Sequence, residues 1–357
     1  MQPITRWFGV TFSDDDRNLG AESACIEQIV EKVLLMQTQA AASQQRPLCR
    51  GTHAKGVVAR ARFEVLDVAA EHDAALAARL ARGIFAKPGL YPAIVRFANS
   101  DAHVNSDFKA DVRSLSFSVD LTCNGTVAPI AGIERQDFSM QKATSVPLND
   151  IPAFLAAMRF LTGSNPAKGL WSLSFQDQLR VARTLVLVQF QARQPLKPYQ
   201  QLRYWSTVPF QHGPGDVVKQ SAIPFPNNPA RSLPKGDPDA LGNELTRHLS
   251  EDTTMSGFDF GLQFLDVDKM TYWGERRDAS FWIENASVEW KESQAPFHTV
   301  ARLTLEPKSR ISGDSGEAEY FDVTRNASPD SAPVGGINRA RWAGEIASRR
   351  ARTRVAK

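Results

Sequence analysis

The chain has 357 residues and a mass of 39.4 kDa, enough for one large domain or two smaller ones with a sizeable core. Its 42% hydrophobic residues are ordinary for a soluble globular protein, and a net charge of only +3 excludes polyanion binding by the whole molecule. The cysteines Cys25, Cys49 and Cys123 suit neither a disulfide framework nor a zinc site, which favours a reducing compartment. The sequence contains neither a signal-peptide pattern nor an apolar run of membrane-spanning length. We therefore expect a soluble, cytoplasmic protein that associates with neither membranes nor nucleic acid.

The first 45 residues are predicted to form an N-terminal helical arm, and residues 46–357 the main domain. Apolar side chains recur at helical spacing between Ala21 and Ala42, as expected for a helix with one buried face. Nothing in this arm points to chemistry.

A histidine lies between two glycines just before a predicted strand. Residues 50–56 read Arg-Gly-Thr-His-Ala-Lys-Gly, and apolar and polar side chains alternate over residues 57–65, which is typical of a half-buried strand. Gly51 and Gly56 indicate tight backbone on both sides of His53. A side chain in this position is held by the sheet and can face a cavity, although a histidine near a turn is more often a surface residue.

Alternation and helical spacing predict the remaining elements. We expect strands at residues 93–98, 112–121, 258–266, 280–284 and 300–305, and helices at 69–84, 151–161, 176–191 and 338–354. Residues 194–238 are rich in proline and carry several aromatic side chains, so they are predicted to be a long loop that wraps the domain. Strands scattered between helices favour an α+β fold with a large antiparallel sheet or barrel.

Two strands carry polar residues that could serve a ligand. Arg96 is flanked by apolar neighbours, which is unusual for an arginine in solvent. Ser114, Ser116 and Ser118 share one face of the strand at 112–121. A flat partner could lie on this face of small hydroxyl groups, or the face could simply be in solvent.

Several motifs, in order, resemble the catalase-related haem proteins over residues 45–352. Residues 50–56 are similar to the family's Arg-x-x-His-Ala-Lys-Gly, residues 96–99 to its Arg-Phe-Ser strand, and residues 111–117 to its Asp-x-Arg-Gly-x-Ala-x-Lys/Arg strand. Segments 136–138, 288–290 and 333–341 are also similar. Each motif alone is weak, and the resemblance rests on their order and spacing.

The resemblance implies an antiparallel eight-stranded β-barrel with surrounding helices and haem b between the barrel and a helix near the C-terminus. His53 then matches the distal histidine, which takes a proton from a bound hydroperoxide and returns it to the departing oxygen. Arg50 and Arg96 match arginines that pair with the haem propionates, and Arg352 is a third candidate by spacing.

The expected iron ligand is replaced in this sequence. In the family an arginine is followed four residues later by the tyrosine whose phenolate binds the iron. Arg341 stands at the arginine position, but Glu345 stands where the tyrosine is expected. Glu345 is either an altered axial ligand, since a carboxylate can ligate ferric iron weakly, or a surface residue paired with Arg341 and Arg349. We expect Tyr320, the nearest tyrosine in the sequence, not to reach this place.

The distal side also departs from the family, whose amide residue falls near Lys142. We therefore expect a haem-dependent oxidoreductase with weak catalase activity, which acts as a peroxidase or converts hydrogen peroxide or organic hydroperoxides. The alternative is a catalase-fold protein that has lost haem and binds a ligand or partner without catalysis. Assembly into a homo-oligomer is left open. The arginine-rich last segment could also contact phosphates, but such arginines are more often in solvent or on propionates.

Overall fold

A computed structural model describes residues 19–70, 72–122, 133–163, 166–229, 231–251, 255–311 and 318–355. Residues 1–18 of the predicted arm and Cys123 lie outside these ranges. Cys25 and Cys49 are free thiols. In the described ranges, no helix is both long enough and apolar enough to cross a membrane.

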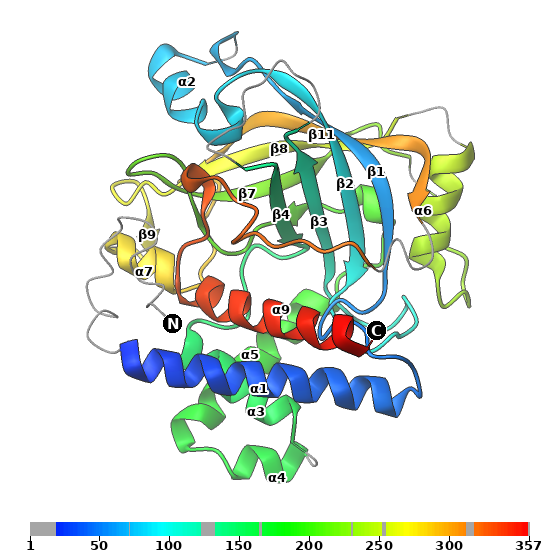
Figure 1. Cartoon of the computed structure of the whole chain (residues 1–357). Coiled ribbons are helices and arrows are strands. Elements are labelled where there is room, and N and C mark those ends of the chain that lie inside the picture. The colour runs from blue at the N-terminus through cyan, green and yellow to red at the C-terminus, as the bar shows by residue number, and fades with distance from the viewer. Residues whose placement is uncertain are drawn as a thin grey trace.

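Eight antiparallel strands close into a barrel within the described residues (Figure 1). They are β1 (Gly56–Val65), β2 (Gly89–Asn99), β3 (Arg113–Asp120), β4 (Arg135–Gln141), β5 (Tyr204–Trp205), β7 (Val217–Pro224), β8 (Gly257–Phe264) and β11 (Phe297–Ile311). The order around the barrel is β5-β4-β3-β2-β1-β11-β8-β7, and pairing of β5 with β7 closes it. The short strand β6 (Phe210–Gln211) pairs with β7, while β9 (Thr271–Tyr272) and β10 (Glu275–Arg276) form a separate hairpin.

The alternation of side chains decides which residues fill the barrel. Phe63, Phe117, Phe138 and Phe260 meet inside it, with ring centroids 4.6 Å apart for Phe117 and Phe138 and 5.0 Å apart for Phe138 and Phe260. Because side chains of a strand point alternately to the two faces, the serines that neighbour Phe117 in β3 face outward. The barrel interior is therefore packed with aromatic rings, and any site facing β3 serines must lie outside the barrel.

Helices lie mainly below the barrel, with others beside it and at its opposite end (Figure 1). They are α1 (Leu19–Ser43), α2 (Ala74–Leu80), α3 (Ile151–Leu161), α4 (Pro166–Trp171), α5 (Phe175–Ala192), α6 (Ala240–Glu251), α7 (Ala279–Glu284) and α9 (Gly336–Val355). Single 3₁₀ turns occur at Val68–Ala70, Gly83–Phe85, Tyr199–Gln201 and Pro329–Ser331. The helices α1 and α9, from opposite ends of the chain, lie side by side below the barrel.

Both apolar packing and a buried ion pair hold α1 against α9. Ile29 and Val33 of α1 pack with Ala340 of α9 in a cluster that also includes side chains of α3. Arg339 of α9 is buried, and its guanidinium lies 2.6 Å from a carboxylate oxygen of Glu22. The described part of the predicted arm is thus packed on the main domain.

The structure differs from the sequence-based assignments in three places. The segment predicted as a strand at 280–284 is the helix α7, because Asp278 caps it by accepting from the Phe281 amide at 2.9 Å. The predicted wrapping loop 194–238 contains the strands β5, β6 and β7. The predicted helix 69–84 is instead the short helix α2 between two 3₁₀ turns.

Candidate active site

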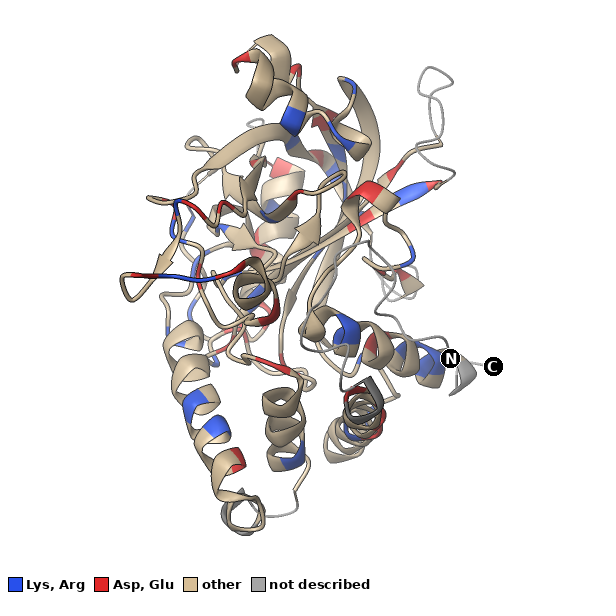
Figure 2. Ribbon diagram, turned by 90° about the vertical axis from the view of Figure 1, so that its left-hand side faces the viewer, with Lys and Arg blue, Asp and Glu red and all other residues tan. Residues whose placement is uncertain are grey.

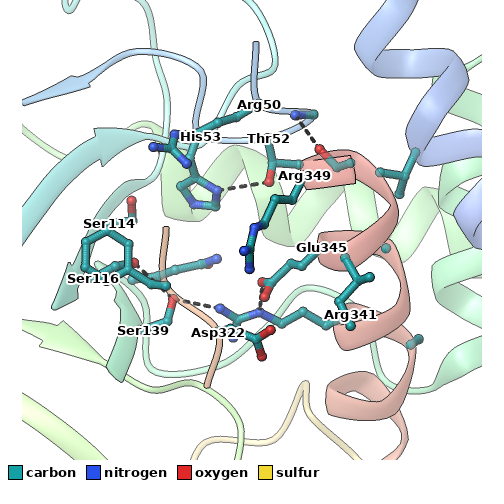
Figure 3. Close-up of a pocket in the computed structure, with 18 of the residues that line it drawn as sticks. Arg50, Thr52, His53, Ser114, Ser116, Ser139, Asp322, Arg341, Glu345 and Arg349 are labelled. Carbon is teal, nitrogen blue, oxygen red and sulfur yellow. Dashed lines mark hydrogen bonds and ion pairs between the residues drawn. The ribbon is translucent and has the colours of Figure 1, made fainter. Parts of the chain in front are cut away.

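A cavity of about 300 Å³ lies between the outer face of strands β2–β4 and helix α9 (Figure 3). Its lining includes every site residue proposed from the sequence, namely Arg50, His53, Arg96, Arg341, Glu345 and Arg352. Figure 3 shows Ser114, Ser116 and Ser139 on the strand wall, with Arg341, Glu345 and Arg349 extending toward them from α9. Residues far apart in the sequence thus meet in one place.

His53 is held in an unusual backbone conformation at the edge of this cavity. Its φ angle is +58°, in the left-handed region that non-glycine residues rarely adopt. The His53 amide donates to the Ser100 carbonyl at 3.1 Å, and the Ala54 amide donates to the Asp101 carbonyl at 3.1 Å. Nδ1 of the imidazole lies 3.1 Å from the Thr52 hydroxyl oxygen, which leaves Nε2 for a molecule in the cavity.

Arg96 supports this conformation from β2. Its guanidinium donates to the His53 carbonyl at 2.9 Å and packs directly on Gly56. A Cβ atom at Gly56 would lie 2.6 Å from Cζ of Arg96 and 2.6 Å from the Phe97 carbonyl oxygen. Glycine is therefore required at position 56 so that Arg96 can reach under the His53 turn.

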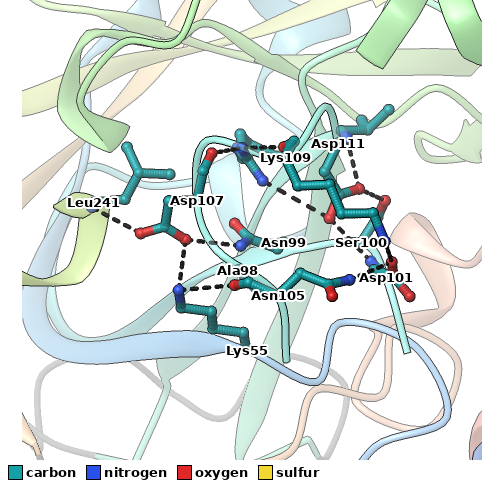
Figure 4. Close-up of polar contacts among 12 residues, drawn as sticks. Lys55, Ala98, Asn99, Ser100, Asp101, Asn105, Asp107, Lys109, Asp111 and Leu241 are labelled. Carbon is teal, nitrogen blue, oxygen red and sulfur yellow. Dashed lines mark hydrogen bonds and ion pairs between the residues drawn. The ribbon is translucent and has the colours of Figure 1, made fainter. Parts of the chain in front are cut away.

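A buried ionic network anchors the loop to which His53 is bonded (Figure 4). Lys55 Nζ lies 2.9 Å from a carboxylate oxygen of Asp107, whose side chain is fully buried. Asp107 also accepts from the Asn99 side chain at 2.9 Å and from the Leu241 amide at 2.8 Å. The lysine that follows His53 by two positions thus ties the turn to the loop 99–111 and to α6.

The surroundings of His53 keep its imidazole neutral. Burial, followed by the positive charges of Arg96, Arg341 and Arg50, lowers the pKa of His53 to about 3. A neutral imidazole can accept a proton from a bound molecule, and the same surroundings favour its prompt return.

On the α9 wall, Arg341 connects the helix to the barrel. Its Nε lies 2.6 Å from a carboxylate oxygen of Glu345, and its Nη2 donates to the Ser139 hydroxyl at 2.6 Å. Glu345 therefore forms the expected pair with Arg341. Arg349 makes a different contact, with its guanidinium carbon 3.4 Å from the centre of the Tyr320 ring.

Tyr320 and Gln141 are among the cavity residues that were not expected there from the sequence. We expected Tyr320 not to reach this place, but it lines the same cavity as Glu345, because Arg50 donates to the Glu319 carbonyl and Arg135 donates to the Tyr320 carbonyl at 2.7 Å. Gln141 supplies an amide to the lining, whereas Lys142 points elsewhere and donates to the Pro195 carbonyl at 3.2 Å. Strand alternation in β4 could have identified Gln141, because it shares a face with Ser139.

The cavity lining combines an imidazole, a carboxylate, small side chains and arginines. An imidazole, His53, lines the cavity together with the α9 carboxylate of Glu345. Small side chains also line it, namely Ser114, Ser116 and Ser139 on the strands and Ala340 and Gly344 on α9. Arg50 and Arg352 bring positive charge that suits propionates. The described residues contain no cluster of three or more histidine, cysteine or acidic side chains that could hold a metal ion by themselves.

Comparison with known proteins finds similarity in structure only. No family model and no curated protein sequence matches the chain. The structure is similar to a fungal catalase, with 14% identity, a TM-score of 0.64, and coverage of 88% of this chain and 61% of that one. It is also similar to catalase A from Saccharomyces cerevisiae, with 15% identity, a TM-score of 0.64, and coverage of 88% of this chain and 63% of that one. For a bacterial catalase the identity is 16% and the TM-score 0.60, with coverage of 90% of this chain and 60% of that one.

The chain spans less than two thirds of the length of each of these catalases. At such low sequence identity the likeness concerns the fold, and the eight-stranded barrel with its surrounding helices agrees with it. This chain therefore has the fold of the catalases.

Proposed function

We propose that the cavity binds haem and that the protein converts hydrogen peroxide or organic hydroperoxides, with His53 as the distal acid–base residue. The observation that carries this proposal is a neutral imidazole, held at a φ angle of +58°, in a cavity that it shares with a carboxylate-bearing helix. Strained backbone of this kind persists where the surrounding structure fixes it, often at functional sites.

The residues around the cavity have distinct proposed roles. Arg50 and Arg352 would hold the propionates, and Glu345 would present a carboxylate oxygen to the iron. Arg96 lies nearly buried against the His53 carbonyl, so its charge would contribute to propionate binding while its hydrogen bond positions the histidine. Bound haem would supply the iron centre at which the oxygen–oxygen bond of a hydroperoxide is broken.

The proton transfers would belong to His53. Because its pKa lies near 3, the imidazole is neutral at physiological pH and can accept the hydroperoxide proton. The nearby arginines disfavour the imidazolium form, so the proton passes readily to the departing oxygen. The amide of Gln141, which lines the cavity from β4, would orient the substrate.

The test combines haem titration with a variant of the histidine. Haemin added to the purified protein should give a saturable Soret band, and His53→Asn should keep this band while peroxidase turnover falls by about a hundredfold or more. Asparagine tolerates the left-handed backbone conformation, so the turn is preserved. His298 lies outside the cavity lining, so the control variant His298→Asn should leave turnover unchanged. Equal turnover in native protein and His53→Asn would refute the proposed role.

A second candidate function rests on the α9 wall. Glu345 is already paired with Arg341, which also binds Ser139, and a cavity of about 300 Å³ is at the small end for ligand sites. These contacts favour a protein that has lost haem and binds a smaller ligand, or a partner, without catalysis. Absence of a saturable Soret band would support this candidate over the first.

A further inference from the structure

The helix α5 carries a continuous row of exposed apolar side chains on the side away from α3. Phe175, Leu179, Val186 and Phe190 are each between 55 and 74% exposed, and Ala182 lies among them at helical spacing. We call these five residues the α5 face. Single exposed apolar residues are ordinary, but a row along about four turns of one helix indicates a surface that is covered in the assembled protein.

The position of α5 leaves this face open. Its opposite side, with Val181 and Thr184, is buried toward α3 and the segment before it, where the Thr184 hydroxyl donates to the Pro147 carbonyl at 3.1 Å. In Figure 2 the helices below the barrel stand in a row, and α5, with one acidic and two basic bands, stands at its end. A partner can therefore approach without displacing another described element.

The charges of α5 are already used within the chain. Asp177 and Arg180 pair at 2.8 Å, and Arg183 donates to the Ser287 hydroxyl at 2.7 Å. These are the only charged residues of the helix. A helix that binds an anionic membrane surface carries a strongly basic polar face, which α5 lacks. The α5 face is thus suited to an apolar protein surface.

The pattern of the α5 face is symmetric about its centre. Phe175 and Phe190 are equally far from the midpoint between Ala182 and Arg183, and so are Leu179 and Val186. In an antiparallel pair related by a two-fold axis at this midpoint, Phe175 of each copy meets Phe190 of the other copy. The small side chain of Ala182 lies at the crossing point, where it allows close approach of the two helices.

A groove beside one end of the helix completes this match. It measures about 690 Å³ and is lined by Leu185, Val186, Phe190 and Pro195, among others. In the antiparallel arrangement the protruding Phe175 of one copy comes to this groove of the other. We propose that the α5 face is a homodimer interface in which α5 packs antiparallel against α5 of a second copy. This inference does not depend on haem or on peroxide chemistry.

Sedimentation velocity of the full chain over a wide concentration range tests the dimer. We expect a monomer–dimer equilibrium, and the double variant Leu179→Glu/Val186→Glu should raise the dissociation constant by about tenfold or more. Trp273→Glu, at an apolar residue between β9 and β10 that is more exposed than Leu179 or Val186, is the control and should leave the constant unchanged. A monomer at all concentrations, or a dimer insensitive to the double variant, would overturn the proposal.

Cysteine cross-linking tests the orientation even if the double variant folds poorly. The cysteine of Ala182→Cys should form a disulfide with the same cysteine of the second copy, because the two thiols lie near the two-fold axis. Phe175→Cys alone should not form a disulfide between copies, but a mixture of Phe175→Cys and Phe190→Cys should. The control for each experiment is the unmodified chain, which retains its native cysteines. Cross-linking of Phe175→Cys to itself would show a parallel arrangement and contradict the proposal.

Discussion

The two walls of the cavity are built in different ways. On the barrel wall, His53 is fixed by backbone hydrogen bonds, by the nearly buried Arg96 and by the network around Asp107. On the α9 wall, Arg341 and Glu345 are partly exposed and form a pair four residues apart on one helix. Removal of a buried charge partner is costly, whereas an exposed helical pair contributes only tenths of a kcal/mol. The chain can thus change the α9 side at little cost to stability, and this is the side on which glutamate replaces the expected tyrosine.

The largest effect is expected for Lys55→Met on the barrel wall. It leaves the fully buried carboxylate of Asp107 without its cation, so the free energy of unfolding should fall by about 3 kcal/mol, as measured by urea denaturation. The control is Lys109→Met. The exposed ammonium of Lys109 lies 3.1 Å from Asp101, so its loss should lower the free energy of unfolding by less than about 1 kcal/mol. An equal loss of stability in the two variants would show that the buried ion pair does not stabilise the fold more than the exposed one.

A somewhat smaller effect is expected for Gly56→Ala. The added Cβ would collide with Arg96 and with the backbone at Phe97, so unfolding should require about 1–3 kcal/mol less free energy. Gly242→Ala is the control, because a Cβ there meets nothing within 4 Å and alanine favours the helix α6. A stable Gly56→Ala protein with unchanged His53 chemical shifts would show that Arg96 does not position the histidine.

The pH dependence of stability should report the neutral His53. Since its pKa is about 3 in the folded protein and about 6.5 when unfolded, the unfolded chain binds the extra proton first as the pH falls. This residue therefore lowers stability progressively between about pH 6.5 and about pH 3, and it has no such effect above this window. The stabilities of native protein and His53→Asn, measured by denaturation at a series of pH values, should therefore diverge as the pH falls through this window. Parallel curves, or an imidazole that titrates by NMR near its ordinary pKa, would contradict the assignment.

The smallest effect on stability is expected at the α9 wall, where Glu345→Gln breaks a partly exposed pair within one helix. The loss should be about 0.3–0.5 kcal/mol, but the electron paramagnetic resonance spectrum of ferric haem should change if this carboxylate is an axial ligand. Glu306→Gln, in the surface pair with Arg62, should cost a similarly small amount without any spectral change. An unchanged spectrum in Glu345→Gln would remove the iron-ligand role.

Regular patterns in the sequence predicted most of the barrel, and irregular segments did not. Long alternating strands such as β1 and long helices such as α9 have several turns or repeats from which the period can be recognised. By contrast, β5 and β6 have two residues each, and the six residues of α7 are too few to distinguish a strand from a helix. In β7 the polar side chains of Lys219 and Gln220 are buried with the apolar ones, so no alternation is visible.

The candidate site was predictable to the extent that it lies on such regular elements. His53 precedes β1, Arg96 belongs to β2, and Glu345 belongs to α9, so the resemblance could place them. Tyr320 lies in a segment without regular structure, and only tertiary contacts through its backbone bring it to the cavity. The row of apolar residues on α5 was predicted as a helix, but its exposure depends on which side packs against α3, and the sequence pattern does not decide this.

The most direct test of the account is a haemin titration of the native chain beside Ser116→Trp. Ser116 lines the cavity on its strand wall, so an indole there would occupy the space for a flat ligand without entering the barrel core. We predict a saturable Soret band with one haem per chain for the native protein and a loss of this band in Ser116→Trp, with both proteins folded by circular dichroism. Binding of haem that is equal in the two proteins, or absent from both, would contradict a haem site between β3 and α9.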